Sequence, residues 1–124
     1  MSILAKGAMS VQIDGALTTS SSLAFRMPVK GKLVAVYGAV GTAPVGTDLL
    51  VDIHKEGTTI FTTQTNRLTV ADGAAEGAAG TVSGIEVPSF AAGDLFLIDV
   101  DQVGSGTAGS DLVVTFAIEG DSLA

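Results

Sequence analysis

The most constraining feature of this sequence is a series of short segments in which apolar and polar residues alternate. In DLLVDIHK (residues 48–55), Leu49, Val51 and Ile53 fall on one face of an extended chain, and polar residues occupy the other face. The segment DLVVTFAIE (111–119) alternates in the same way. No segment repeats apolar residues at the spacing of a helix of any length. Alternation with a period of two is typical of strands with one buried face, so the chain is predicted to be all-β.

About eight short strands of this kind are separated by turn residues, mainly Gly, Pro, Asp and Ser. This arrangement predicts an antiparallel β-sandwich of the jelly-roll type. A length of 124 residues suits one domain. We expect an N-terminal arm over residues 1–10, which lack a clear period, and a single sandwich over 11–124, with a Gly- and Ala-rich loop at 72–84. The predicted strands cover residues 9–13, 22–29, 32–40, 48–55, 58–64, 67–71, 85–90, 95–103 and 111–119.

A short motif recurs at the start of three predicted strands. GTDLL (46–50), GDLFL (93–97) and GSDLV (109–113) each place a Gly and an Asp before a Leu and an alternating segment. The Asp side chain is expected to accept bonds from nearby backbone amides, and the Leu to open the buried face. The loops that precede the first and third copies, 41–45 and 104–108, should lie at equivalent places in the sandwich.

The charges are distributed unevenly along the chain. Residues 1–67 carry six basic and four acidic residues, whereas residues 68–124 carry nine acidic residues and no basic one. Regions of opposite sign suit docking onto a charged surface or onto a second copy. Nucleic acid is not an expected partner, because phosphate contacts need clustered Lys and Arg. A membrane is not expected either, because the longest apolar run (33–40) is far shorter than the ~20 residues that span a bilayer.

Gly104, Gly106 and Gly109 have the spacing of a dinucleotide-binding fingerprint and follow a predicted strand. In that fold a helix begins at the last glycine, and an acidic residue that holds the ribose follows about 20 residues later. Here the residues after Gly109 alternate as a strand does. We therefore interpret the glycines as part of a hairpin loop and expect no cofactor.

Asp99 and Asp101 are the best candidates for chemistry, because carboxylates two residues apart on a strand share one face at roughly 7 Å. Such a pair is used by glycosidases and by metal sites. No other Asp, Glu or His lies at a recognisable ligand spacing, and His54, the only histidine, has Lys55 beside it. We interpret the pair as part of a solvated or interface surface and His54 as a surface position. No catalytic residue and no metal are expected.

Two predicted strands carry apolar residues on both faces. In 95–103, Phe96 begins one apolar face, yet Leu95 and Leu97 lie on the other, and 32–40 is similarly two-faced. A sandwich buries one face of each sheet, so the outer apolar residues favour a subunit interface at Leu95 and Leu97. The alternative is that a loop or the N-terminal arm covers them.

Two segments carry a resemblance to a known structural module. DLLVDIHKEGTTIFTT (48–63) and AAGDLFLIDVDQVGS (91–105) resemble a β-sandwich module that recurs in head-fibre, decoration and tail-associated proteins of tailed bacteriophages. The likeness extends over residues 33–120. It implies a structural role in the virion, often as a homotrimer. The shared motifs are structural, so the resemblance carries over no catalytic residue.

We therefore expect a capsid decoration, or cement, protein, made in the host cytoplasm and located on the virion, where it binds the major capsid protein at the outer surface of the head. One alternative is a tail or baseplate accessory protein that contacts host glycans. Another is a small glycan-active enzyme that uses Asp99 and Asp101. The expected docking surface is the basic N-terminal side of the chain. The residues predicted to contact the partner are Ile3, Leu4, Lys6, Lys30 and Lys32.

Overall fold

The structure, a computed structural model, describes residues 4–78 and 89–121. These residues form strands joined only by antiparallel pairings, together with one turn of 3-10 helix, so the predicted all-β antiparallel fold is confirmed. The elements are β1 (Leu4–Ala16), β2 (Ser22–Arg26), β3 (Gly31–Ala39), β4 (Leu49–Lys55), β5 (Thr58–Thr59), η1 (Gln64–Asn66), β6 (Leu68–Val70), β7 (Glu76–Ala78), β8 (Ser89–Phe90), β9 (Leu95–Gln102) and β10 (Ser110–Asp121).

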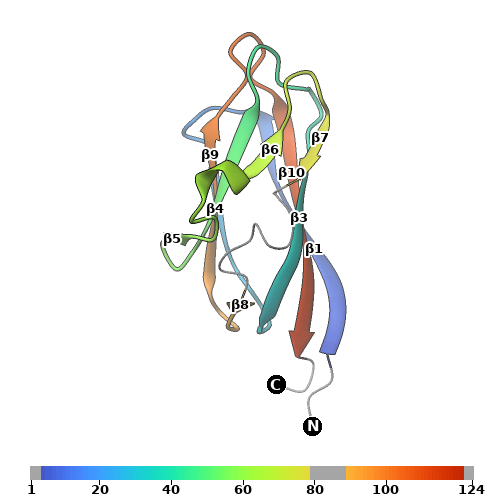
Figure 1. Cartoon of the computed structure of the whole chain (residues 1–124), viewed down its shortest axis with the longest axis vertical. Coiled ribbons are helices and arrows are strands. Elements are labelled where there is room, and N and C mark those ends of the chain that lie inside the picture. Colours follow the sequence, from blue (N-terminus) through green and yellow to red (C-terminus); the bar gives the residue numbers. More distant parts are fainter. Residues whose placement is uncertain (1–3, 79–88, 122–124) are drawn as a thin grey trace.

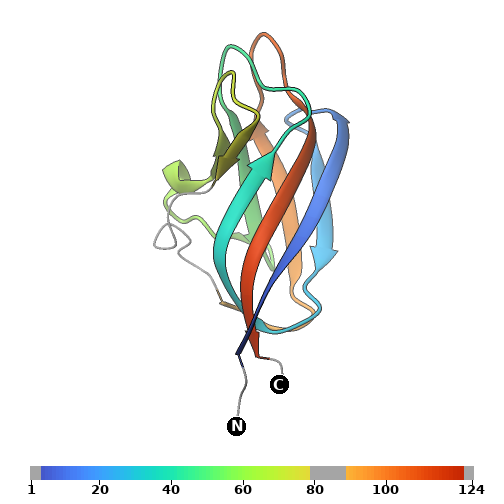
Figure 2. The ribbon, with the colours of Figure 1, turned by 90° about the vertical axis from the view of Figure 1, so that its right-hand side faces the viewer.

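The strands form two packed layers (Figures 1 and 2). One layer has β10 between β1 and β3, and the other has β9 between β4 and β2. The short strands β6 and β7 link β3 to β4, so the sheet runs unbroken in the order β1-β10-β3-β7-β6-β4-β9-β2. The result is a sandwich closed along one side, compatible with the jelly-roll type. The ends of β1 and β10 near the chain termini lie at the opposite end of the molecule from the β6–β7 pair (Figure 1).

Apolar side chains from both layers fill the space between them. The rings of Phe96 on β9 and Phe116 on β10 meet edge to face, with their centroids 6.2 Å apart. Phe25 from β2 stacks on Phe96 at 5.5 Å, and Phe90 from β8 meets Phe96 edge-on at 5.8 Å. Burying a large apolar side chain contributes roughly 1.5–3 kcal/mol, so this aromatic cluster is a major source of stability.

The apolar residues on both faces of β3 are explained by an irregularity in its pairing with β10. The register with β10 shifts between Ala35 and Leu33, which leaves Val34 as one extra residue, a β-bulge. Because of the bulge, both Leu33 and Val36 are buried, although they have opposite parity in the sequence. The apolar residues on both faces of this segment therefore need no second buried surface. Tyr37, which lies between the buried Val36 and Gly38 in the sequence, is 52% exposed.

The recurring Gly-Asp motif forms similar turns at its three positions. In each turn the glycine has a positive φ: Gly46 at 102°, Gly93 at 87° and Gly109 at 100°. This is a conformation that side chains disfavour. In each turn the Asp also accepts a bond from a backbone amide, but only Asp94 bonds a neighbouring one. Asp48 accepts from the amide of Asp72, and Asp111 from that of Gly15.

The leucine that follows the Asp of this motif faces inward in only two of the three copies. Leu49 and Leu112 are fully buried, as expected. Leu95 instead is 37% exposed, because Phe96 takes the inward position on β9. The motif therefore specifies the turn, but it does not determine whether the leucine after it faces the core or the solvent.

The structure differs from the expected boundaries at the N-terminus. Residues 4–10, expected to belong to an arm, form the first half of β1 and pair with β10 without a break from Leu4 to Ile13. The small residues Gly7 and Ala8 hide the alternation of this segment in the sequence. Residues 1–3 lie outside the described residues. The expected 72–84 loop contains the short strand β7, and the predicted 85–90 strand lies outside the described residues except for β8.

The glycines with fingerprint spacing belong to a loop between β9 and β10. This loop packs against the loop at 41–45 through an isolated bridge between Val45 and Thr107, so the two loops lie together at one end of the sandwich. A Cβ at Gly104 would collide with the carbonyl oxygen of Thr107 and with the backbone of Val45. The glycine at 104 thus permits close approach of two backbones, and a strand, not a helix, follows.

We predict that Gly104→Ala destabilises the fold by about 1–3 kcal/mol, since overpacking against backbone atoms forces the two loops apart. Gly106→Ala is the matched control, because its nearest neighbour would be the oxygen of Val45 at 3.4 Å. Its cost should stay near 0.5 kcal/mol. Denaturant unfolding of both variants measures the difference, and equal costs would contradict this account of the loop.

Candidate functional site

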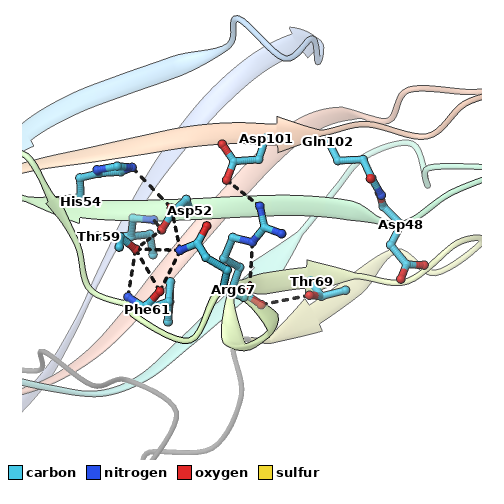
Figure 3. A network of polar contacts seen from close by, with 11 residues as sticks. Asp48, Asp52, His54, Thr59, Phe61, Arg67, Thr69, Asp101 and Gln102 are labelled. Atoms are coloured by element: carbon cyan, nitrogen blue, oxygen red, sulfur yellow. Dashed lines mark hydrogen bonds and ion pairs between the residues drawn. The ribbon is translucent and has the colours of Figure 1, made fainter.

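A polar network covers the outer face of β4 near its middle (Figure 3). Its centre is the carboxylate of Asp52, which is 4% exposed. Oδ1 of Asp52 accepts bonds from the hydroxyl of Thr59 at 2.6 Å and from the amide of Ile53 at 2.8 Å. Oδ2 accepts from Nε2 of Gln64 at 3.3 Å and lies 3.5 Å from Nε2 of His54. These contacts hold β5 and the segment that follows it against β4.

A second part of the network joins η1 and β6 to β9. Arg67 donates from Nε to the carbonyl oxygen of Gln64 at 2.8 Å, and from its guanidinium to Oδ2 of Asp101 at 2.9 Å. The register of β9 with β4 shifts at this point, since Val51 pairs with Val100 and Leu50 with Gln102, which leaves Asp101 as an extra residue. Asp101 thus lies in a bulge, where its ion pair with Arg67 holds it. Nothing in the sequence marks Arg67 as its partner.

Asp99 lies directly across from Asp52 in the β4–β9 ladder. Partial burial raises the pKa of the Asp99 carboxyl, and the nearby charges of Asp101 and, less strongly, Asp52 raise it further, while His54 acts in the opposite direction. Like charges on neighbouring strands disfavour ionisation of each other. The surroundings of Asp99 thus disfavour its charged form.

The geometry of this cluster suits a structural role better than a chemical one. Asp52 has its oxygens occupied by donors of its own chain, and Asp101 is paired with Arg67. Within residues 4–78 and 89–121, no group of three or more His, Asp and Glu side chains is placed to hold a metal ion. In the same part of the chain there is no helix long and apolar enough to cross a membrane.

The two residues of the expected subunit interface lie on the outer face of β9. Leu97 is half-buried and pairs across the sheet with Ala24 and His54. Leu95 is 37% exposed, and its amide donates to the side chain of Glu56 at 2.9 Å. Their cross-strand neighbours on this face are Arg26, Ala24 and His54, so the apolar strip here is narrow.

The structure brings the described members of the expected docking surface together at the end of the sandwich near the termini. Lys6 on β1 and Lys32 on β3 are both register partners of Glu119 on β10. The ammonium of Lys32 lies 3.8 Å from the Glu119 carboxylate. Lys30 precedes β3 at the same end, where its carbonyl oxygen lies near Gly120. Ile3 lies outside the described residues.

Asp52, Thr59, Gln64 and Arg67 are the polar residues that the sequence analysis misses. Asp52 and Thr59 face each other because a two-residue turn folds β5 back onto β4. The turn residue Gly57 is a signal for that hairpin. No comparable signal marks Gln64, which bonds the nearby Thr59 and Phe61 as well as Asp52. None marks Arg67 either, whose partner Asp101 lies on β9, distant in the sequence.

We predict that Asp52→Ala destabilises the protein by about 1–3 kcal/mol, because it removes the acceptor of the part-buried Thr59 hydroxyl and of the buried Ile53 amide. Glu76→Ala, on an exposed position of β7, is the matched control and should change stability by no more than about 0.5 kcal/mol. Urea unfolding followed by circular dichroism measures both. A loss of unfolding free energy no larger than that of the control would contradict a structural role for Asp52.

We predict that Asp99→Asn stabilises the protein at neutral pH. Because the folded state raises the pKa of Asp99 above the ordinary value of 3.8, the folded protein binds this proton more tightly than the unfolded chain. The contribution of this group to stability therefore falls as the pH rises through that window. Solvent screening limits the gain to a few tenths of a kcal/mol. Urea unfolding at several pH values should show the gain disappearing below pH 3.8; a gain that grows in acid contradicts the argument.

Comparisons with known proteins bear on the fold. The sequence matches no protein-family model and no curated protein sequence. A chain of the cyanophage Pam1 capsid asymmetric unit has a TM-score of 0.58 at 16% identity, over 95% of this chain and 85% of that chain. A chain of the complex between Aeromonas sobria serine protease (ASP) and the chaperone ORF2 has a TM-score of 0.51 at 10% identity, over 97% of this chain but 27% of that chain. At these identities the likeness is one of fold.

Proposed function

We propose that this protein is a bacteriophage capsid decoration protein, which binds the major capsid protein at the outer surface of the head and stabilises the shell. The observation that carries the proposal is the likeness to a chain of the cyanophage Pam1 capsid asymmetric unit, which extends over most of both chains. The two chains are thus similar in size as well as in fold. The resemblance of residues 48–63 and 91–105 to phage virion modules points in the same direction.

The chemistry of the described surface also favours a binding role over catalysis. The carboxylates Asp52 and Asp101 are held by donors of the same chain, so they are poorly suited to act on a substrate. Catalysis by a carboxylate pair requires one group to be a proton donor and the other to be free as a base or nucleophile.

The docking surface of this proposal is the end of the sandwich near the termini. It combines Leu4, Lys6, Lys30 and Lys32, with Ile3 next to them in the sequence. The chain as a whole has a formal net charge of −7, although one of its acidic residues, Glu119, lies at this end beside Lys32. A basic end would be attracted to an acidic shell, and the negative remainder would keep decorated particles from adhering to one another.

A homotrimer, with Leu95 and Leu97 at the contact between subunits, completes this proposal. The resemblance to phage virion modules supports the trimer, and the 37% exposure of Leu95 leaves an apolar side chain available for such a contact. A mass of three chains in native mass spectrometry would support it, and loss of that species in Leu97→Asp would place the contact.

A tail or baseplate protein that contacts host glycans is the second candidate. Tyr37 favours it, because its ring is 52% exposed on the outer face of β3, and sugars commonly stack on exposed aromatic rings. Binding of bacterial surface polysaccharide that is lost in Tyr37→Ala would favour this role over capsid decoration.

The test of the decoration role is binding to phage heads that lack the protein. The parent should co-sediment with such heads and raise the temperature at which they rupture. Replacing Lys30 and Lys32 by Gln should weaken binding by about tenfold at low salt, and the difference should shrink at high salt because exposed charges are screened. Ala39→Glu, an exposed change at the other end of β3, measures the effect of one added negative charge away from the docking surface. Failure of the parent to bind heads would overturn the proposal, and equal binding by the lysine variant would move the docking surface elsewhere.

A further inference from the structure

The outer edge of β1 is the longest unpartnered feature of the described structure. β1 stands at one end of the strand order and, among the described residues, pairs with β10 alone. Its pairing with β10 is regular from Leu4 to Ile13, and the bulge comes only after Ile13. In Figure 2 this strand lies along one margin of its layer. Half of its backbone amides and carbonyls therefore point away from the sheet, as in any edge strand.

Natural proteins protect long edge strands with Pro, bulges or several charged residues. Between residues 4 and 13, β1 has no Pro and no bulge, and its one charged residue there is Lys6. Its two faces alternate clearly from residue 8 onward. Ala8, Ser10 and Gln12 are exposed, whereas the intervening apolar side chains are half-buried against the core: Met9, Val11 and Ile13. Such an edge is suited to accept a strand with the same alternation.

We propose that β1 pairs with β1 of a second copy, antiparallel and about a two-fold axis at Ser10, which joins two sandwiches through one continuous sheet. This register places Lys6 opposite Asp14 of the second copy, and Asp14 opposite Lys6 of that copy. These two residues are the single cation and the single anion of the strand. Asp14 is the first residue of the bulge, and it is exposed next to Gln12, which donates to it at 2.9 Å. On the outer face Ala8 meets Gln12 of the second copy, and on the inner face Met9 meets Val11. The pairs between residues 8 and 12 are then polar with polar or small, or apolar with apolar, and Ile13 meets Gly7.

The neighbouring registers lack this match. A shift by one residue along one strand would place outward residues opposite inward ones, which reverses the face of every side chain. A two-fold axis at Met9 would put Asp14 opposite Leu4, and an axis at Val11 would put Lys6 opposite Ala16. Opposite charges across strands favour a register, and like charges disfavour it, so the axis at Ser10 is the one that the charges select.

Charge reversal tests the register. Lys6→Glu places Glu opposite Asp14 of an identical copy, and Asp14→Lys places Lys opposite Lys6, so each variant alone should self-associate about tenfold more weakly than the parent. An equimolar mixture of the two variants pairs opposite charges at both positions and should recover pairing as a heterodimer, as should the double variant with itself. Sedimentation velocity and native mass spectrometry measure the association. Ala39→Lys, exposed on β3, controls for net charge, and thermal melting verifies folding.

Cysteine crosslinking tests the position of the axis. The chain has no Cys, so Ser10→Cys introduces a single thiol opposite its own copy. Directly opposed residues have their Cβ atoms about 4.5–5.5 Å apart, close enough for a disulfide under mild oxidation. Ala8→Cys is the matched control: the two copies of residue 8 would lie about 13 Å apart along the strands, so it should crosslink poorly alone. It should crosslink well when mixed with Gln12→Cys.

This inference is independent of the capsid role, because both tests use purified protein without capsids. A trimer formed through Leu95 and Leu97 would leave β1 free, so the Ser10→Cys disulfide would then join trimers in pairs. Recovery of association in the mixed charge variants, together with the Ser10→Cys crosslink, supports the proposal. A parent protein that does not pair at about 100 μM, or an assembly indifferent to both charges and without the crosslink, overturns it.

Discussion

Packing of the aromatic rings between the two layers is the interaction on which the rest of the structure depends. Phe96 and Phe116 lie on β9 and β10, the middle strands of their layers, so hydrogen-bonded neighbours on both sides hold each of them. Since successive side chains of a strand point to opposite faces, the inward rings decide which residues face out. Leu97 and Asp99 on β9 and Thr115 on β10 are outward positions for this reason. The surface of the molecule is therefore a consequence of its core.

The two outer faces that result differ in character. The face of β4 and β9 is tied together by buried and half-buried polar groups, with Asp52 at their centre. The face of β1, β10 and β3 combines a row of small residues, formed by Ala8, Ala117 and Ala35, with the exposed side chain of Tyr37 in the next row.

The sequence predicts the strands in which apolar and polar residues alternate clearly. It does not predict features that depend on pairing with strands distant in the sequence. Alternation in 48–55 and 111–119 identifies β4 and β10 because each buries one face. The β3 bulge at Val34 cannot be seen in the sequence, since it is defined by the register with β10. β7 was missed because its Gly- and Ala-rich residues have little strand preference, and its pairing with both β3 and β6 holds it. The partners of Asp52 and Asp101 depend in the same way on which strands lie side by side.

We propose that this sandwich is a component of the phage head and meets the shell through the end where β1 begins and β10 ends. An electron cryo-microscopy reconstruction of the virion tests this most directly. The account predicts density for the sandwich on the outer surface of the head, with the end that contains Lys30 and Lys32 against the shell and the 41–45 and 104–108 loops pointing to solvent. Density at the tail or baseplate, or heads that lack the protein altogether, would contradict it.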